Sequence, residues 1–280
     1  MIPVAFDYER ATSVDDAIAK LAGGGKALAG GHSIVPLMKL RLSEPGKLVD
    51  ISKIPGLSGI REVHGQIEIG ATTTHSEIAG SEQLRAACPM IAEAASEIGD
   101  PQVRNRGTIG GSIAHADPAA DFPAVMLALE ADILIKGMNG PRSVKAADFF
   151  RGFYDVDLHT GEIITAIRFA PVRSAAYAKL HQRASHYAIV GAAVALELAG
   201  GTIQRARIGL TGATSCAIRL PAVETALVGK SAADAVAAVQ HASVEAGELN
   251  ADLHASAEYR QAMIPVFVRR AVERAINRGA

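Results

Sequence analysis

Two Gly-Gly segments, each with a serine within two residues of the pair, dominate this sequence. Residues 29–33 read Ala-Gly-Gly-His-Ser after a short apolar stretch, and residues 108–112 read Thr-Ile-Gly-Gly-Ser. Glycine lets the backbone adopt positive φ and approach a ligand closely, and successive exposed N–H groups form a concavity that binds an anion. One such pair is most often a structural turn. Two Gly-Gly segments of matching chemistry predict that both bind one anion. The pyrophosphate of a dinucleotide has enough oxygen atoms to accept hydrogen bonds from both segments.

Other phosphate-binding and nucleophile motifs do not fit the sequence. A Walker A loop ending at residues 229–231 (Gly-Lys-Ser) needs a glycine where Glu224 stands. No G-x-G-x-x-G motif follows a predicted strand, so the Rossmann fingerprint is missing. Ser112, His115 and Asp117 lie too close in sequence for a catalytic triad of the usual geometry, and the chain has no G-x-S-x-G elbow.

The composition excludes several classes of protein. Apolar residues make up 49% of the 280 residues, so a large core can form. The net charge is -1, so the chain has no general electrostatic attraction for nucleic acid. Cys88 and Cys216 cannot supply the four thiolates of an iron–sulfur cluster, and their separation favours a reduced intracellular protein. The nine histidines lack the His-x-x-x-His spacing of a metal site, so no metal ligands are expected.

The sequence predicts a cytoplasmic protein. Its N-terminus lacks the basic and apolar regions of a signal peptide. The longest apolar run, residues 187–196, is about half the ~20 residues that a membrane-spanning helix needs. We therefore expect no transmembrane segment, and any association with the inner face of a membrane would be peripheral and mediated by a complex.

The predicted elements are those of an α+β protein. Ser13 is the predicted N-cap of a helix that ends at the glycines at 23–25. The stretch from 100 to 121, rich in glycine and proline, is predicted to be a long functional loop. Further helices are predicted over 89–98, 123–130, 221–227, 232–247 and 258–277, and strands over 27–29, 47–51, 60–63, 67–69, 133–136, 177–180, 188–196 and 203–210. Because strands precede helices after about residue 177, we expect a separate C-terminal domain that begins near residues 171–174.

Basic residues in and beside the Gly-Gly segments have two interpretations each. His32, inside the first loop, either contacts a cofactor directly or only hydrogen-bonds backbone. Arg104 and Arg106 either pair with phosphate or form a structural pair with Asp100.

Four stretches spread over most of the chain carry a resemblance to a known family. They read AGGHSIVPLMKLRL (29–42), IGDPQVRNRGTIGGSIAHADPAADFPAVMLAL (98–129), GEIITAI (161–167) and KLHQRASHYAIVGAA (179–193). In these stretches the chain resembles the medium, FAD-binding subunit of the molybdenum hydroxylases. The likeness is to the carbon monoxide dehydrogenase type, which is related to the FAD domain of xanthine dehydrogenase.

The resemblance implies a fold and a cofactor. The fold would be an FAD-binding domain over 1–173 of the vanillyl-alcohol-oxidase-like (PCMH) type, with two subdomains divided near 55–60. An α+β C-terminal domain with a three-stranded sheet would follow over 174–280. The FAD would be noncovalent. The cofactor-binding residues expected from matching positions are Ala29, Gly30, Gly31, His32, Ser33, Ile34, Thr108, Ile109, Gly110, Gly111, Ser112, Asp121, Ile164, Lys179 and Tyr187.

Three positions near the flavin end have more specific expectations. The resemblance implies that Lys179 brings a cation to the flavin, where it would stabilise negative charge on the reduced ring and raise its potential. Tyr187 either packs near the isoalloxazine ring or is only an aromatic residue at the start of a core strand. Relatives commonly carry Asp-Tyr where this chain has His186-Tyr187, and this change is expected to affect flavin potential or partner contacts.

The resemblance also implies a role within a complex. In such enzymes a large subunit oxidises the substrate at molybdenum, and a small subunit carries two [2Fe–2S] clusters from which electrons reach the FAD. The chain would then be an oxidoreductase subunit without catalytic residues of its own, in a dimer of heterotrimers, that passes electrons to an external acceptor. The molybdenum cofactor and the clusters would lie only on the partners. Two alternatives remain: a free-standing FAD-dependent oxidase or dehydrogenase, and a nucleotide-binding assembly or regulatory module.

Overall fold

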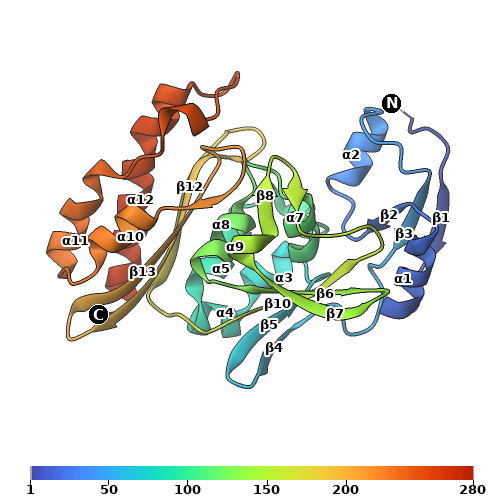
Figure 1. The fold of residues 1–280 in the computed structure, drawn as a ribbon, viewed down its shortest axis with the longest axis horizontal. Helices are drawn as coiled ribbons and strands as arrows, with labels where there is room; N and C mark the ends of the chain where they lie inside the picture. The colour runs from blue at the N-terminus through green and yellow to red at the C-terminus, as the bar shows by residue number, and fades with distance from the viewer. Residues whose placement is uncertain (1, 280) are drawn as a thin grey trace.

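The computed structural model describes residues 2–279, and its three larger sheets follow one another in chain order across the molecule (Figure 1). A three-stranded sheet lies near the N-terminus, a five-stranded sheet in the middle and a four-stranded sheet on the C-terminal side. Helices separate and cover the sheets, so the predicted α+β class is confirmed.

The first fifty residues build a small parallel sheet with the strand order β1–β3–β2. Its elements are β1 (Asp7–Arg10), α1 (Val14–Ala22), β2 (Lys26–Leu28), α2 (Ile34–Lys39) and β3 (Lys47–Asp50). Ser13 caps α1 as predicted, because its Oγ accepts a hydrogen bond from the Asp16 amide at 3.0 Å. Ile18 and Leu21 turn inward from α1 onto Val49, in the smallest of three hydrophobic clusters.

The middle sheet is antiparallel with the order β4–β5–β10–β6–β7, so the strand that comes last in sequence lies at its centre. Its strands are β4 (Ile60–Val63), β5 (Gln66–Gly70), β6 (Asp132–Gly137), β7 (Gly140–Lys145) and β10 (Ile163–Phe169). The helices between β5 and β6 are α3 (His75–Gly80), α4 (Glu82–Ala87), α5 (Pro89–Ser96), α6 (Pro101–Arg104), α7 (Ile109–His115) and α8 (Asp121–Ala128). A short helix and a two-stranded ribbon follow β7: α9 (Ala146–Phe149), β8 (Phe150–Gly152) and β9 (Asp155–Val156).

The prediction of a long irregular loop between residues 100 and 121 is wrong, because α6 and α7 form within it. Asp100 caps α6 by accepting a hydrogen bond from the Val103 amide at 2.8 Å, and Pro101 occupies the first helical turn. Thr108 caps α7, which buries Ile109 and Ile113 completely. Burial of these two side chains stabilises a helix whose glycine content alone argues against one.

The C-terminal sheet has the order β11–β12–β13–β14. Its elements are β11 (Ala175–His181), β12 (Ala188–Ala199), β13 (Thr202–Thr211), β14 (Ile218–Arg219), α10 (Pro221–Leu227), α11 (Ala232–Ala238), the 3-10 turns Val239–His241 and Ala246–Glu248, and α12 (Ala257–Gly279). The prediction of three strands missed β14, whose two residues are too few to show an alternating pattern. The helix predicted over 232–247 is too long, since the chain turns into 3-10 geometry after Ala238.

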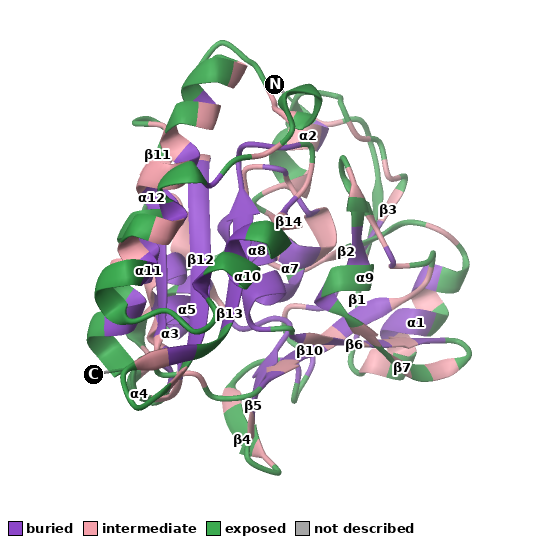
Figure 2. Ribbon diagram, turned by 60° about the vertical axis from the view of Figure 1, so that its left-hand side comes forward, coloured by how far each residue is buried: buried purple, intermediate pink, exposed green. Residues whose placement is uncertain are grey.

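The C-terminal sheet is buried on both faces, and Figure 2 shows β12 buried along most of its length. One face packs on α12 and contributes Val194 and Leu196 to a core with that helix. The other face packs on α5 and α8, and there Tyr177 and Ala193 join the core of the middle sheet. The C-terminal sheet therefore shares a core with the middle sheet across the predicted boundary.

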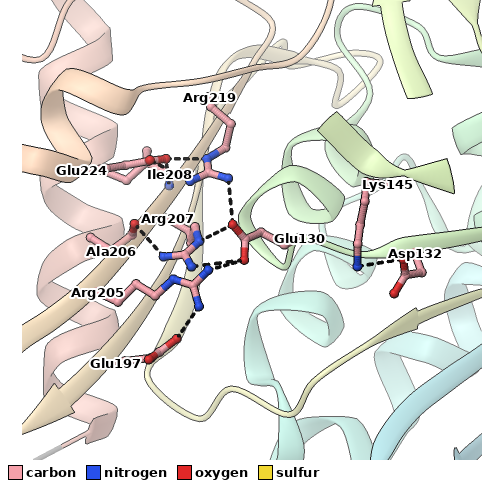
Figure 3. Close-up of polar contacts among 10 residues, drawn as sticks. All are labelled: Glu130, Asp132, Lys145, Glu197, Arg205, Ala206, Arg207, Ile208, Arg219 and Glu224. Carbon is pink, nitrogen blue, oxygen red and sulfur yellow. Dashed lines mark hydrogen bonds and ion pairs between the residues drawn. The ribbon is translucent and has the colours of Figure 1, made fainter. Parts of the chain in front are cut away.

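An ionic cluster fixes the C-terminal end of α8 to the C-terminal sheet (Figure 3). Glu130 contacts Arg205 at 2.7 Å, Arg207 at 2.6 Å and Arg219 at 3.5 Å. Glu130 itself has φ +49, a left-handed conformation that is uncommon without glycine. Its carboxylate thus joins three arginines from two strands to the end of one helix.

No helix among residues 2–279 is long and apolar enough to cross a lipid bilayer.

Candidate cofactor site

The first Gly-Gly segment connects β2 to α2 and leaves its backbone donors free. Gly31 has φ +78, which glycine adopts without strain. Within residues 2–279, the amide groups of Gly30, Gly31, His32 and Ser33 donate no hydrogen bond. The Ser33 side chain also makes no capping bond at the start of α2. Such a run of free donors has the chemistry of an anion-binding site.

The second Gly-Gly segment differs from the first, because it is the start of α7 and its amide groups are already paired. Those of Ile109 and Gly110 donate to the carbonyl oxygens of Thr73 at 3.1 Å and Ala71 at 2.8 Å. The Gly111 amide donates to Thr108 Oγ1 at 3.1 Å. The prediction of an exposed turn with positive φ is therefore wrong here. The glycines serve close packing instead, since a Cβ on Gly110 would lie 2.6 Å from that of Ala71.

The structure places the first segment against Arg106 and Gly107, the two residues directly before the second segment. A Cβ on Gly30 would lie 2.7 Å from the carbonyl carbon of Arg106 and 3.0 Å from Cα of Gly107, too close for any side chain. His32 Nε2 lies 3.3 Å from the carbonyl oxygen of Gln102. Residues that are far apart in sequence thus form one site, with free amide donors on one side and a packed helix start on the other.

Basic residues at this contact have backbone partners. Arg104 donates to the carbonyl oxygens of Ile98 at 3.0 Å and Gly99 at 2.9 Å, so its structural role does not involve Asp100. His32 likewise has a backbone partner, the carbonyl oxygen of Gln102, and contact with a cofactor stays a prediction.

Ile164 lies beside the second segment, at a bulge in the central strand. The register of β10 against β6 shifts between Ile164 and Ala166, and the carbonyl oxygen of Thr165 accepts a hydrogen bond from the Ala71 amide at 3.0 Å. Because Ala71 in turn holds Gly110, the bulge places the backbone around Ile164 against the start of α7.

A buried polar cluster lies at the start of α8. Asp121, only 4% exposed, accepts a hydrogen bond from Tyr177 Oη at 2.5 Å and pairs with Lys179 Nζ at 2.8 Å. The Lys179 side chain has no exposed surface, and Nζ also donates to the carbonyl oxygens of Glu97 at 2.9 Å and His186 at 2.8 Å. All three of its donors are thus occupied within the protein, and its role as a cation beside the flavin stays a prediction.

Tyr187 is half-exposed and lines a cavity of about 370 Å³. The cavity lies between the β11–β12 turn, residues 117–119 and the coil at 250–254. Tyr154 lines the same cavity and donates to Asp117 Oδ2 at 2.9 Å. Burial raises the pKa of Tyr187 to about 12, with Asp117 and Asp121 adding to the effect, so its hydroxyl stays protonated at neutral pH.

Two residues of this region have no signal in the sequence. Tyr177 is completely buried in an apolar strand, and only its partner Asp121 shows why a hydroxyl is needed there. His75 follows three threonines and contacts Gly107, directly before the second Gly-Gly segment, through both its backbone and its ring. A sequence pattern of this kind does not distinguish such a histidine from one in an ordinary helix cap.

The fold that carries these segments is that of a flavoprotein, as two family models show. A family model described as the FAD binding domain in molybdopterin dehydrogenase matches residues 4–171. A second, described as the CO dehydrogenase flavoprotein C-terminal domain, matches residues 175–275. The chain therefore belongs to the family of FAD-binding medium subunits of carbon monoxide dehydrogenase-type molybdenum hydroxylases, which are oxidoreductase components.

Relatives along the whole chain agree with this assignment. The carbon monoxide dehydrogenase medium chain of Hydrogenophaga pseudoflava is 42% identical over 287 residues, covering 100% of both chains. A solved carbon monoxide dehydrogenase from the same organism superposes with a TM-score of 0.94 at 42% identity, over 99% of each chain. Quinoline 2-oxidoreductase from Pseudomonas putida 86 superposes with a TM-score of 0.91 at 31% identity, again over 99% of each chain.

Proposed function

We propose that this chain holds FAD noncovalently across the two Gly-Gly segments and transfers electrons from a partner's [2Fe–2S] clusters to an external acceptor. The observation that carries the proposal is the contact between the first segment and the residues directly before the second. Gly30 packs against the backbone of Arg106 and Gly107, and the four amide groups from Gly30 to Ser33 are free beside that contact. A pyrophosphate needs several such donors in one place.

The remaining residues extend the site from the pyrophosphate to the flavin end. The start of α7, with Thr108, Ile109, Gly110, Gly111 and Ser112, would support the ribityl region, while Ala29 and Ile34 flank the free amides. Asp121, Ile164 and Tyr187 would surround the flavin end. FAD supplies the reversible uptake of electrons, whereas the protein binds it, orients it and sets its surroundings. The neutral Asp121–Lys179 pair would act here by shaping the site.

We also propose the partners of the chain. Its relatives are named as medium chains or subunits of carbon monoxide dehydrogenase and of nicotine 6-hydroxylase. On that basis a large molybdenum-binding subunit and a small [2Fe–2S] subunit would join it, as two heterotrimers. The cysteines of this chain, Cys88 and Cys216, are free, and two thiols are too few for a four-thiolate cluster.

Cofactor binding can be tested on the purified chain. We expect flavin absorbance bands after incubation with FAD, and we expect the flavin to stay in solution when acid precipitates the protein. Yellow colour in the pellet would contradict noncovalent binding and favour the free-standing oxidase alternative. A chain that binds no FAD at all would contradict the proposal and favour an assembly or regulatory module.

Electron transfer can be tested in the complex purified from the native host. We expect accompanying chains that carry molybdenum and iron–sulfur, and we expect the FAD absorbance to bleach anaerobically when the substrate of the molybdenum subunit is added. Removing that subunit should abolish the bleaching. Reduction of the isolated chain by a small-molecule substrate would instead identify a free-standing dehydrogenase.

A further inference from the structure

His75 lies directly behind the contact between the two Gly-Gly segments. Its amide group donates to the carbonyl oxygen of Gly107 at 2.9 Å. The edge of its ring faces the same residue, since a Cβ on Gly107 would lie 2.6 Å from Nε2 and 2.7 Å from Cδ2 of His75. Gly107 also adjoins Gly30 on the first segment. The backbone of Gly107 is therefore enclosed between the first segment and an imidazole ring.

The imidazole of His75 is buried with an unpaired nitrogen. The residue is 5% exposed, and Nδ1 has no hydrogen-bond partner within residues 2–279. Leaving a buried polar atom unpaired is unfavourable, so such an atom in a folded protein needs an explanation. Nδ1 lies on the far edge of the ring and has no accessible surface, so a ligand does not reach it. Nε2 lies on the edge that faces Gly107, is not fully buried and has no hydrogen-bond partner within residues 2–279, so it is the nitrogen that a ligand can meet.

The ring is held in its neutral form. Burial lowers the pKa of His75 to about 4, and the nearby His32 and Arg104 act in the same direction. A neutral imidazole has one N–H donor and one acceptor nitrogen. It can thus hydrogen-bond an oxygen of a ligand without adding a buried charge that would need compensation.

The ring of His75 also contacts the first turn of α8. Its ring lies 5.3 Å from that of Phe122, centroid to centroid. Phe122 directly follows Asp121, whose carboxylate belongs to the polar cluster at the start of α8. His75 therefore contacts both Gly107 and the first turn of α8, the helix that begins with Asp121.

We infer that His75 is a cofactor-binding residue, whose imidazole gives FAD one hydrogen bond at an oxygen atom where the two Gly-Gly segments meet. The inference rests on the proposed function, because it assumes that FAD occupies this site. It adds a side-chain contact in a region where the other contacts come from the backbone.

Two variants separate the hydrogen bond from the shape of the ring. His75→Phe keeps an aromatic ring against Gly107 but has no nitrogen, whereas His75→Gln keeps a polar group. Isothermal titration of each apoprotein with FAD should show His75→Phe about tenfold weaker than the unchanged chain, the effect of one lost hydrogen bond. His75→Gln should retain affinity within about threefold, on the same scale. Circular dichroism of the apoproteins serves as the control for folding.

Three outcomes would overturn the inference. The first is FAD affinity of His75→Phe equal to that of the unchanged chain, which would leave His75 only a packing role. The second is an equal loss in the Phe and Gln variants. The third is an unchanged ¹⁵N shift of the His75 imidazole when FAD is added to the unchanged chain, a measurement that needs no variant. Failure of the unchanged chain to bind FAD would instead contradict the proposed function.

Discussion

Lys179 and Asp121 form a buried ion pair of 2.8 Å that joins the C-terminal sheet to the first residue of α8. The ammonium group also donates hydrogen bonds to the carbonyl oxygens of Glu97 and His186, so the pair fixes the end of α5 and the turn before Tyr187. Because the charges compensate each other, the pair acts on its surroundings mainly through position.

Breaking this pair should be costly. Asp121→Asn leaves a buried ammonium group without its counter-charge, and we expect it to lower the free energy of unfolding by about 3 kcal/mol. The double variant Lys179→Met/Asp121→Asn should lose less than the sum of the single variants, as measured by urea denaturation. The reduction potential of the flavin provides a second check. If Lys179→Met shifts this potential only because it leaves Asp121 without its counter-charge, the double variant should restore it. A potential that stays shifted in the double variant would mean that the lysine acts on the flavin as a cation.

Gly30→Ala should weaken FAD binding without unfolding the protein. The new Cβ would collide with the Arg106 carbonyl group and push the two Gly-Gly segments apart. We expect at least about tenfold lower affinity in FAD titrations, or roughly 1.4 kcal/mol. Gly80→Ala is the matched control, since a Cβ there has nothing within 4 Å. Equal affinities of the two variants would contradict the importance of the contact.

Glu130→Gln should loosen the attachment of the C-terminal sheet to α8. The carboxylate is 44% exposed, so solvent weakens each of its ion pairs, and we expect a loss of about 1 kcal/mol in the free energy of unfolding. Glu197→Gln is the control. Its carboxylate is 62% exposed and lies 3.4 Å from Arg205, and the expected change is close to zero (Figure 3). Similar losses of unfolding free energy in both variants would show that the ion pairs of Glu130 contribute no more than that of Glu197.

The burial of His75 should make stability depend on pH. Its folded-state pKa of about 4 lies below the usual 6.5, so between these values the unfolded chain binds a proton that the folded chain does not. The free energy of unfolding therefore rises with pH from about 4 to 6.5 and is level above, and acidification removes about 3 kcal/mol. We expect the free energy of unfolding, measured by urea denaturation at a series of pH values, to change less with pH in His75→Gln than in the unchanged chain. Parallel curves would contradict a neutral buried imidazole.

The sequence predicted those elements whose signals are local. Ser13 and the acidic residues after it mark the start of α1, and the continuous apolar run at 188–196 marks β12. It failed at residues 100–121, where glycine and proline favour a loop but burial of Ile109 and Ile113 stabilises α7. Tertiary packing determines the helical structure of this segment, and no local sequence pattern shows which side chains will be buried.

The same division holds for the candidate site. The two Gly-Gly segments are visible in the sequence. The structure brings them near each other through the contact of Gly30 with Gly107, directly before the second segment. The different state of their amide groups could not be predicted, because the partners of the second segment, Ala71 and Thr73, lie on a distant turn. His75 owes its unpaired nitrogen to the same long-range arrangement.

The small N-terminal sheet has the smallest hydrophobic cluster of the molecule, and its first Gly-Gly segment carries free donors at the contact with the second. A ligand bridging the two segments would bind only the folded form and would stabilise it in proportion to the logarithm of its concentration. Flavin supply would then regulate the lifetime of the chain as well as its redox competence. Starved of cofactor, the protein should be cleaved first within residues 2–50, and hydrogen exchange there should slow as FAD is added.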